Sequence, residues 1–188
     1  RRITYATSFG SWVENFPLRE KELLPWIEQF DALSMREESG VRMLQSRGMA
    51  CEWVLDPTLL LEQTDYDKIA EKRIIDEPYV LLFSWNGAEE AVEITKKVSD
   101  KLGCKAFYIV PPPRAMFCGI QRKLDVGPRE FLSLVKYAEF IVTNSFHGTV
   151  FSTIYKKPFI SAIKGEVDPR RASLMKQLGL ENHLISPE

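Results

Sequence analysis

Apolar residues along this chain follow two spacings in turn. Short apolar runs predict buried strands. Between them, apolar residues that recur every three or four positions predict helices with one apolar face. The expected strands are Ile3–Phe9, Ala32–Met35, Cys51–Leu55, Tyr79–Ser84, Ala106–Val110, Phe140–Val142 and Pro158–Ala162. The expected helices are Lys21–Phe30, one that follows Arg36–Ser39 and runs to about Ser46, Tyr66–Ile75, Ala88–Leu102, one from Pro128, one with His147 in its first turn that runs to Tyr155, and Pro169–Leu178. This alternation predicts a three-layer α/β/α domain with a mostly parallel sheet and helices on both faces.

Residues 139–155 (EFIVTNSFHGTVFSTIY) carry the clearest candidate for a binding site. A buried strand is followed by Asn144 and Ser145, which are residue types that cap helices. Gly148 allows close approach of the backbone, and His147 lies in the first turn, at the positive end of the helix dipole. Such a junction suits a phosphate, and an imidazole there can move a proton. The alternative is a junction that binds nothing, with His147 as a capping or packing residue.

Other polar residues follow strands and are expected at the same edge of the sheet, where parallel α/β proteins bind ligands. They are Arg36, Ser39, Ser84, Asn86, Asn144, Ser145 and His147. The glycine fingerprint G-x-G-x-x-G is absent, which argues against a nicotinamide or flavin dehydrogenase. Residues 111–127 are expected to form a long loop, either functional or a solvated connector, with Arg114, Arg122 and Lys123.

Composition narrows the class of protein. The 188 residues are 45% hydrophobic and 27% charged, with a net charge of -1, which gives no general attraction to nucleic acid. Three widely separated cysteines show no metal-ligand spacing and indicate a reducing compartment. No apolar run approaches the roughly 20 residues that cross a bilayer. The sequence opens at Arg1 directly before a strand-like run, so we expect an upstream part.

Five elements together resemble the polysaccharide pyruvyl transferase family, in the right order over nearly the whole chain. The strongest is Thr143–Ser152 (TNSFHGTVFS). The others are Tyr5–Gly10 (YATSFG), Leu33–Gly40 (LSMREESG), Leu55–Leu60 (LDPTLL) and Arg170–Leu174 (RRASL) with the following Leu-Gly-Leu. The resemblance implies that residues 1–188 are a single Rossmann-like domain, the C-terminal half of a two-domain protein of the GT-B type whose N-terminal domain is missing.

The resemblance also implies a reaction. The family transfers pyruvate from phosphoenolpyruvate to two hydroxyls of a sugar on a polysaccharide or lipid carrier, which forms a cyclic pyruvate ketal without a redox cofactor or a metal. His147 would be the acid or base, and Arg36 would clamp the phosphate or carboxylate of the donor. The other residues expected to bind substrate are Asn144, Ser145, Gly148, Thr149, Ser39 (which would cap its helix) and Arg170.

Alternatives remain at several of these positions. Arg36 could pair with Glu37 or Glu38 at the surface, Ser39 could be a helix-turn residue, and Arg170 with Arg171 could form a solvated face. Asp56 is expected only to end a strand before Pro57. Two rival functions are a glycosyltransferase that uses a nucleotide sugar and a non-catalytic binding domain of the same fold. We expect a cytoplasmic protein, either free or held at the inner face of the membrane through its acceptor, and expect residues 1–188 alone to be inactive.

Overall fold

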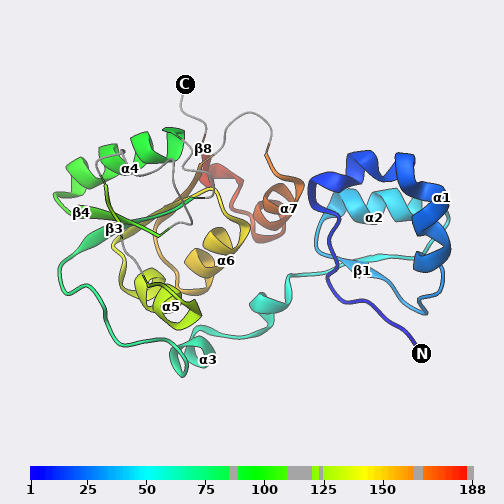
Figure 1. Cartoon of the computed structure of the whole chain (residues 1–188), viewed down its shortest axis with the longest axis horizontal. Helices are drawn as coiled ribbons and strands as arrows, with labels where there is room; N and C mark the ends of the chain where they lie inside the picture. Colours follow the sequence, from blue (N-terminus) through cyan, green and yellow to red (C-terminus); the bar gives the residue numbers. More distant parts are fainter. Residues whose placement is uncertain (85–88, 110–119, 123–124, 163–166, 186–188) are drawn as a thin grey trace. The chain divides into compact units, whose positions relative to one another are not determined.

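The computed structural model describes residues 1–84, 89–109, 120–122, 125–162 and 167–185 (Figure 1). The chain forms two compact units, and each is described here by itself. Unit 1 comprises Arg1–Leu60 and Val167–Glu181, and unit 2 comprises Leu61–Glu166 and Asn182–Glu188. The expectation of a single domain that forms half of a longer protein stays a prediction.

Unit 2 is built on a six-stranded parallel sheet with the strand order β5-β4-β3-β6-β7-β8. Its strands are β3 (Tyr79–Phe83), β4 (Lys105–Tyr108), β5 (Gln121–Arg122), β6 (Phe140–Thr143), β7 (Phe159–Ala162) and β8 (Leu184–Ile185). The chain runs outward from β3 through β4 to β5, then returns to the other side of β3 and runs outward again from β6. This is the Rossmann order, with its reversal between β3 and β6. The predicted parallel α/β fold is confirmed.

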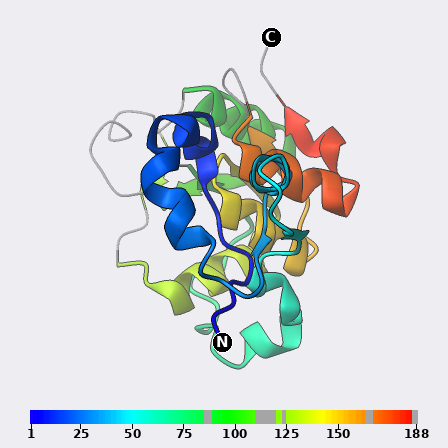
Figure 2. The ribbon, with the colours of Figure 1, turned by 90° about the vertical axis from the view of Figure 1, so that its right-hand side faces the viewer.

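Helices cover both faces of this sheet. They are α4 (Glu89–Leu102), α5 (Pro128–Tyr137) and α6 (Phe146–Ile154), and the short α3 (Gln63–Asp67) packs on α6 through Tyr66 and Phe151. α4 lies on one face, and α5 and α6 lie on the other (Figures 1 and 2). Ala91 and Ile94 of α4 pack on Val80, Leu82 and Val142 of the two central strands. These strands are apolar on both faces because both faces are covered, which is typical of a parallel sheet.

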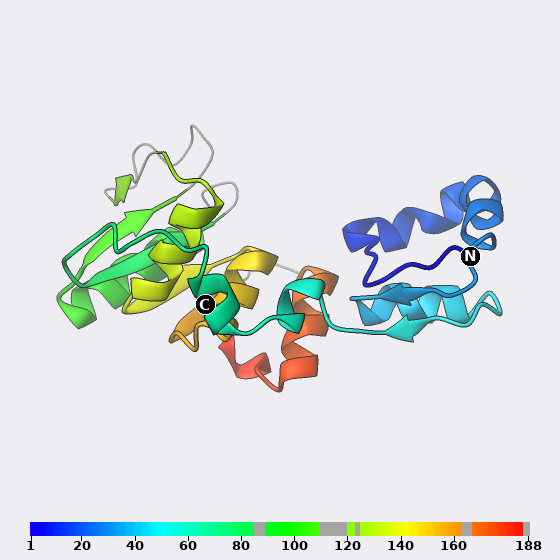
Figure 3. The same ribbon diagram turned by 90° about the horizontal axis from the view of Figure 1, so that it is seen from below.

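Unit 1 is smaller and combines the first sixty residues with a later segment, Val167–Glu181. Its elements are η1 (Gly10–Asn15), α1 (Phe16–Ile27), β1 (Ser34–Met35), α2 (Glu38–Gln45), β2 (Glu52–Trp53), η2 (Pro57–Leu60) and α7 (Pro169–Leu178). β1 and β2 pair in parallel, and Met35, Val41, Leu44 and Cys51 form the core between this pair and α2. Figure 3 shows the first residues of the chain (dark blue) running along the β1–β2 pair.

Several expected elements differ from the structure. The predicted strand Ile3–Phe9 is wrong, because this segment makes only isolated bridges, from Ile3 to Ala32 and from Thr7 to Met35. The helix expected from Lys21 begins earlier, at Phe16, with Pro17 in its first turn. Pro25 therefore falls near the end of this helix.

The helix predicted over Tyr66–Ile75 is also wrong, because it ends at Asp67. The residues after it bond to α5 instead of continuing the helix. The Glu71 N–H donates to the Arg129 carbonyl at 3.0 Å, and the Ser133 hydroxyl donates to the Lys72 carbonyl at 2.8 Å. β5 was likewise unexpected, since it lies inside the stretch predicted to be one loop. Within the described residues, no helix has the length and apolar character needed to cross a membrane.

Candidate functional site

The ends of β3 and β6 and the start of α6 meet at the point where the strand order of unit 2 reverses. Open α/β sheets bind ligands at this point, at the carboxyl ends of the strands. The Thr143 hydroxyl donates to the Phe83 carbonyl at 2.6 Å and accepts from the Ser145 N–H at 3.0 Å, so it ties the two strand ends together. Gly148 packs directly against this hydroxyl, and a Cβ at that position would collide with Thr143. Glycine is therefore required there for close packing of α6 on β6.

Ser145 is the N-cap residue of α6, as its type predicts. Its backbone is extended, and its hydroxyl accepts from the Gly148 N–H at 3.4 Å. The Thr149 hydroxyl donates to the Ser145 carbonyl at 3.2 Å and lies 3.4 Å from the Ser161 hydroxyl. Both side chains are buried, with Ser145 4% and Thr149 0% exposed. The structure therefore gives both residues a part in building the start of α6, and their contact with phosphate stays a prediction.

His147 lies in the first turn of α6 and is exposed to solvent. Its ring makes an edge contact with the ring of Phe146, with the centroids 5.3 Å apart. Asn144, between the strand and the N-cap, is half-buried. An exposed imidazole at the positive end of a helix can reach a bound anion and exchange protons with it.

In unit 1, Arg36 follows β1 and lies mostly buried beside Asp56. Its Nη1 donates to Asp56 Oδ2 at 2.5 Å, and the two side chains are 19% and 2% exposed. Asp56 also accepts from the hydroxyl and the N–H of Thr58, at 2.6 and 3.0 Å. Burial raises the pKa of Asp56, but the hydrogen bonds from Thr58 and Arg36 outweigh it and hold the pKa below its usual value. Asp56 thus orients the Arg36 side chain. From the sequence, Asp56 was expected only to end a strand, and this role was not predicted.

The acids considered as partners of Arg36 bond elsewhere. Glu37 is 0% exposed, and its Oε1 accepts from the N–H groups of Phe9 and Gly10 at 2.5 and 2.9 Å. This carboxylate closes the turn that leads into η1. Glu38 is held by Arg42 and by Lys176 of α7, at 2.6 and 2.8 Å.

Arg170 lies at the start of α7 and forms a two-point contact with Asp168, the N-cap residue of this helix. Its Nε donates to Asp168 Oδ1 at 3.0 Å, and its Nη2 donates to Oδ2 at 2.5 Å. The hydrogen bonds to Asp168 raise the pKa of Arg170. Arg171 is buried, which lowers its pKa and excludes the solvated face considered for this pair.

Asp56 and Asp168 share a signal that could have found them in the sequence. Each precedes a proline, and each accepts from the backbone N–H two residues later. This is the turn that an aspartate before a proline commonly forms. In both cases the same carboxylate also accepts hydrogen bonds from an arginine. In this chain, an aspartate before a proline thus holds an arginine side chain in place.

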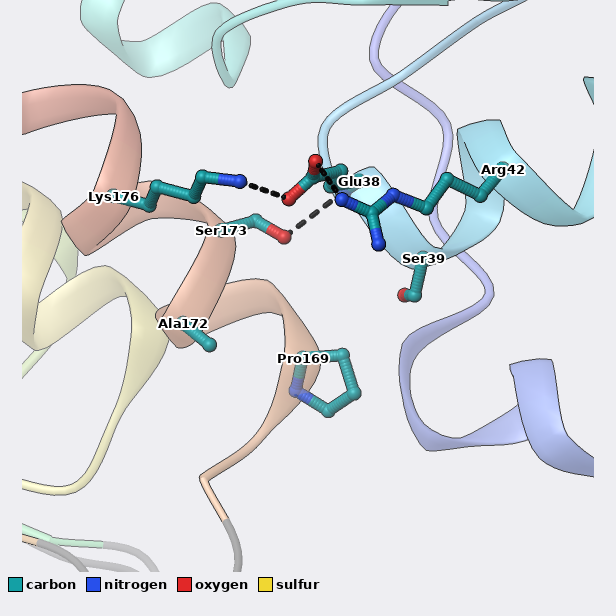
Figure 4. Close-up of a pocket in the computed structure, with 7 residues that line it drawn as sticks. All are labelled: Glu38, Ser39, Arg42, Pro169, Ala172, Ser173 and Lys176. Carbon is teal, nitrogen blue, oxygen red and sulfur yellow. Dashed lines mark hydrogen bonds and ion pairs between the residues drawn. The ribbon is translucent and has the colours of Figure 1, made fainter.

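A pocket of about 390 Å³ lies between α2 and α7 within unit 1 (Figure 4). Its lining residues come from these two helices: Glu38, Ser39, Arg42, Pro169, Ala172, Ser173 and Lys176. The Ser173 hydroxyl accepts from the Glu38 N–H at 2.9 Å and so caps α2. The expected cap of α2 by Ser39 is therefore not the one that forms. The Ser39 hydroxyl lies at the pocket and is buried without a hydrogen-bond partner among the described residues.

The predicted site residues thus fall into two groups. Asn144, Ser145, His147, Gly148 and Thr149 gather at the start of α6 in unit 2, whereas Arg36, Ser39 and Arg170 belong to unit 1. Asn86, Arg114 and Lys123 lie outside the described residues. Within the described part of the chain, no group of three or more His, Cys, Asp or Glu side chains is arranged to hold a metal ion.

Comparison with known proteins agrees with the sequence motifs. The family model described as polysaccharide pyruvyl transferase matches residues 1–163. No curated protein matches the chain.

Among solved structures, UDP-GlcNAc 2-epimerase from Methanocaldococcus jannaschii is 17% identical with a TM-score of 0.60, covering 98% of this chain and 58% of its own. The S. aureus MnaA–UDP co-structure is 13% identical with a TM-score of 0.53, covering 92% of this chain and 50% of its own. The chain therefore spans less than two thirds of the length of either structure, and at these identities the likeness shows the fold alone.

Proposed function

Because this chain belongs to the polysaccharide pyruvyl transferase family, we propose that it serves the transfer of pyruvate from phosphoenolpyruvate to a sugar. The observation that carries this proposal is the exposed imidazole of His147 in the first turn of α6, where the strand order of the sheet reverses. Phosphate groups bind at such helix starts, and the donor is a phosphate ester.

The reaction needs one proton delivered and two carbon–oxygen bonds formed. The methylene carbon of phosphoenolpyruvate gains a proton, and the adjacent carbon is attacked by a sugar hydroxyl. The bond between this carbon and the phosphate oxygen breaks, and a second hydroxyl attacks the same carbon and closes the ring. The products are the cyclic ketal and inorganic phosphate, and the two hydroxyl protons balance the one on the new methyl group and the one on phosphate. His147 would exchange the proton with the methylene carbon.

Arg36 would hold the phosphate or carboxylate of the donor, with Asp56 fixing the direction of its guanidinium. Ser145, Gly148 and Thr149 would shape the helix start, with Asn144 beside them, and Arg170 would be a second anion contact. The sugar acceptor would be carried on a polysaccharide or lipid. Residues 1–188 alone would bind the donor weakly and show no turnover, because sites of this architecture are completed by a second domain.

The test is a transfer assay in the intact enzyme with phosphoenolpyruvate and the sugar acceptor. Loss of a general acid typically lowers the rate by about 100- to 10,000-fold, and we expect this for His147→Ala. His183→Ala is the matched control, because that imidazole bonds the Phe159 carbonyl at 3.0 Å and stacks on its ring. Near-wild-type turnover by His147→Ala would refute the role of this residue.

Donor identity is tested separately by calorimetric titration of the chain with phosphoenolpyruvate and with UDP-GlcNAc. We expect binding of phosphoenolpyruvate that weakens in Arg36→Ala. Binding of the nucleotide sugar without binding of phosphoenolpyruvate would favour the glycosyltransferase alternative. The solved structures with this fold include one whose description names bound UDP, which makes this comparison necessary.

A further inference from the structure

The pocket between α2 and α7 has two walls of different character. Pro169 and Ala172 of α7 contribute apolar surface on one side (Figure 4). Glu38, Arg42 and Lys176 form a row of charged groups on the other, with the carboxylate between the two cations. A volume of about 390 Å³ is within the range of small-molecule sites.

The charged row has a net charge of +1, but both cations are already paired with Glu38, which weakens their attraction for a bare anion. Each oxygen of Glu38 already accepts from one cation, Arg42 at 2.6 Å and Lys176 at 2.8 Å. These interactions lower the pKa of Glu38, with the bond from Lys176 as the largest cause, so the carboxylate stays charged near neutral pH. An anion would have to compete with the Glu38 carboxylate for Arg42 and Lys176, because the attraction between opposite charges stabilises both existing pairs.

A hydroxyl-rich ligand fits the same groups without displacing them. The guanidinium and ammonium have further N–H groups to donate, and the carboxylate oxygens have lone pairs left to accept. Arg42 and Lys176 are 71% and 52% exposed, so these groups are accessible. The Ser39 hydroxyl, buried without a partner among the described residues, can both donate and accept. A group of this kind gains most from a polar ligand, because an unmet buried hydroxyl is unfavourable.

We propose that the α2–α7 pocket binds one neutral sugar ring, with its hydroxyls on Ser39, Glu38, Arg42 and Lys176 and its C–H face on Ala172 and Pro169. Its assignment as the place where the acceptor sugar is held rests on the function proposed above. The binding itself requires neither donor nor turnover, so it can be tested independently of that function.

The test is ¹H–¹⁵N NMR titration of the whole chain with methyl glycosides of neutral hexoses, and separately with inorganic phosphate. We expect shift changes confined to the amides of α2 and α7 with a hexose glycoside, and none there with phosphate. Changes on phosphate but not on any glycoside would overturn the proposal, as would glycoside-induced changes that lie only outside these two helices. Absence of any change with every glycoside would overturn it as well.

Two variants test whether the glycoside binds in this pocket. Ala172→Phe fills the pocket from its apolar side and is expected to weaken glycoside binding by about 10-fold or more, equivalent to ~1.4 kcal/mol. Ser39→Ala removes the unpartnered hydroxyl with little change in volume and is expected to weaken it by several-fold. The control Arg19→Ala removes an exposed ion pair with Glu22 on α1, away from the pocket, and leaves binding unchanged.

Thermal melts of each variant show whether it is folded, and Ser39→Ala remains informative if Ala172→Phe is not. Wild-type affinity in Ser39→Ala and in a folded Ala172→Phe would refute the pocket as the binding site. If pyruvyl transfer fails in the intact enzyme but the glycoside binds here, the function proposed above is wrong and the sugar pocket stands.

Discussion

Gly148 of α6 lies against the hydroxyl of Thr143 at the end of β6, so that a Cβ added to this glycine would collide with Oγ1 of the threonine. The same Cβ would lie 2.9 Å from Cδ1 of Phe83. The threonine side chain cannot move freely, because its hydroxyl bonds both the Phe83 carbonyl and the Ser145 N–H. The start of α6 is thus positioned by contact between helix and strand.

We therefore expect Gly148→Ala to destabilise the protein by about 1–3 kcal/mol, as overpacking of a close contact does. Urea denaturation measures this free energy of unfolding. Gly103→Ala is the control, because a Cβ there meets nothing within 4 Å and its cost arises only from a φ of +62°. Equal stability of Gly148→Ala and the wild type would show that α6 can move away from β6.

Two variants of Ser145 can distinguish its contribution to capping α6 from its contribution to anion binding. Ser145→Ala removes the side chain that accepts from the Gly148 N–H and is expected to cost about 1 kcal/mol. Ser145→Asp keeps a capping oxygen, and its charge suits the helix dipole, so stability should stay near the wild-type value.

The same aspartate would repel a phosphoryl donor at the helix start. Titration calorimetry should therefore show phosphoenolpyruvate binding to Ser145→Asp weakened by about 10-fold, or ~1.4 kcal/mol, although this variant is as stable as the wild type. Unchanged donor affinity in Ser145→Asp would place the phosphate elsewhere.

Asp56 holds Arg36 in a mostly buried pair, so its charge should matter for both stability and donor binding. Asp56→Asn keeps the shape but weakens the bonds from Arg36 and Thr58, with an expected loss of about 2 kcal/mol in the free energy of unfolding. Donor affinity should fall as well, because the guanidinium is no longer fixed. Glu22→Gln, which weakens an exposed pair with Arg19, is the control and should be nearly neutral.

The pKa of Asp56 also predicts how stability depends on pH. Because this pKa is lower in the folded protein than in the unfolded chain, unfolding takes up a proton at acidic pH. The stabilisation is complete above the unfolded pKa of about 4 and is lost as pH falls through the lower folded value. Asp168, whose pKa is also lowered by its bonds to Arg170 against the opposing effect of burial, should add in the same direction.

Urea denaturation of the wild type and Asp56→Asn between neutral pH and pH 3 measures this contribution. The variant should lose less stability on acidification, with the remaining slope owed to Asp168 and other carboxylates. Parallel curves for the two proteins would contradict the lowered pKa of Asp56.

Local signals predicted some elements closely. The helix Pro169–Leu178 has the expected bounds because proline starts it and Gly179, with a φ of 65°, ends it. The strand β6 and the N-cap Ser145 were likewise predicted from adjacent residues. All these features depend on neighbours in the sequence.

Features that depend on distant partners were missed. Residues 3–9 have the apolar pattern of a strand, but they pair with the segment at residues 32–35 only through isolated bridges. The partner of Arg36 lies 20 residues away, and the pocket at Ser39 is closed by α7, with Ser173 bonded to a residue 135 positions earlier. Hydrophobic spacing shows that α7 has a face to bury, but it does not show which element that face contacts.

Unit 1 consists of the first sixty residues and of α7, near the other end of the sequence. During synthesis, the ribosome must therefore translate Leu61–Glu166, most of unit 2, before the segment that supplies Ser173 and Lys176 emerges. A domain of this kind cannot complete its folding while its first part is still a nascent chain, in contrast to domains that fold in order of translation. Proteolytic cutting between the two units would likewise release two separate pieces of unit 1, not one.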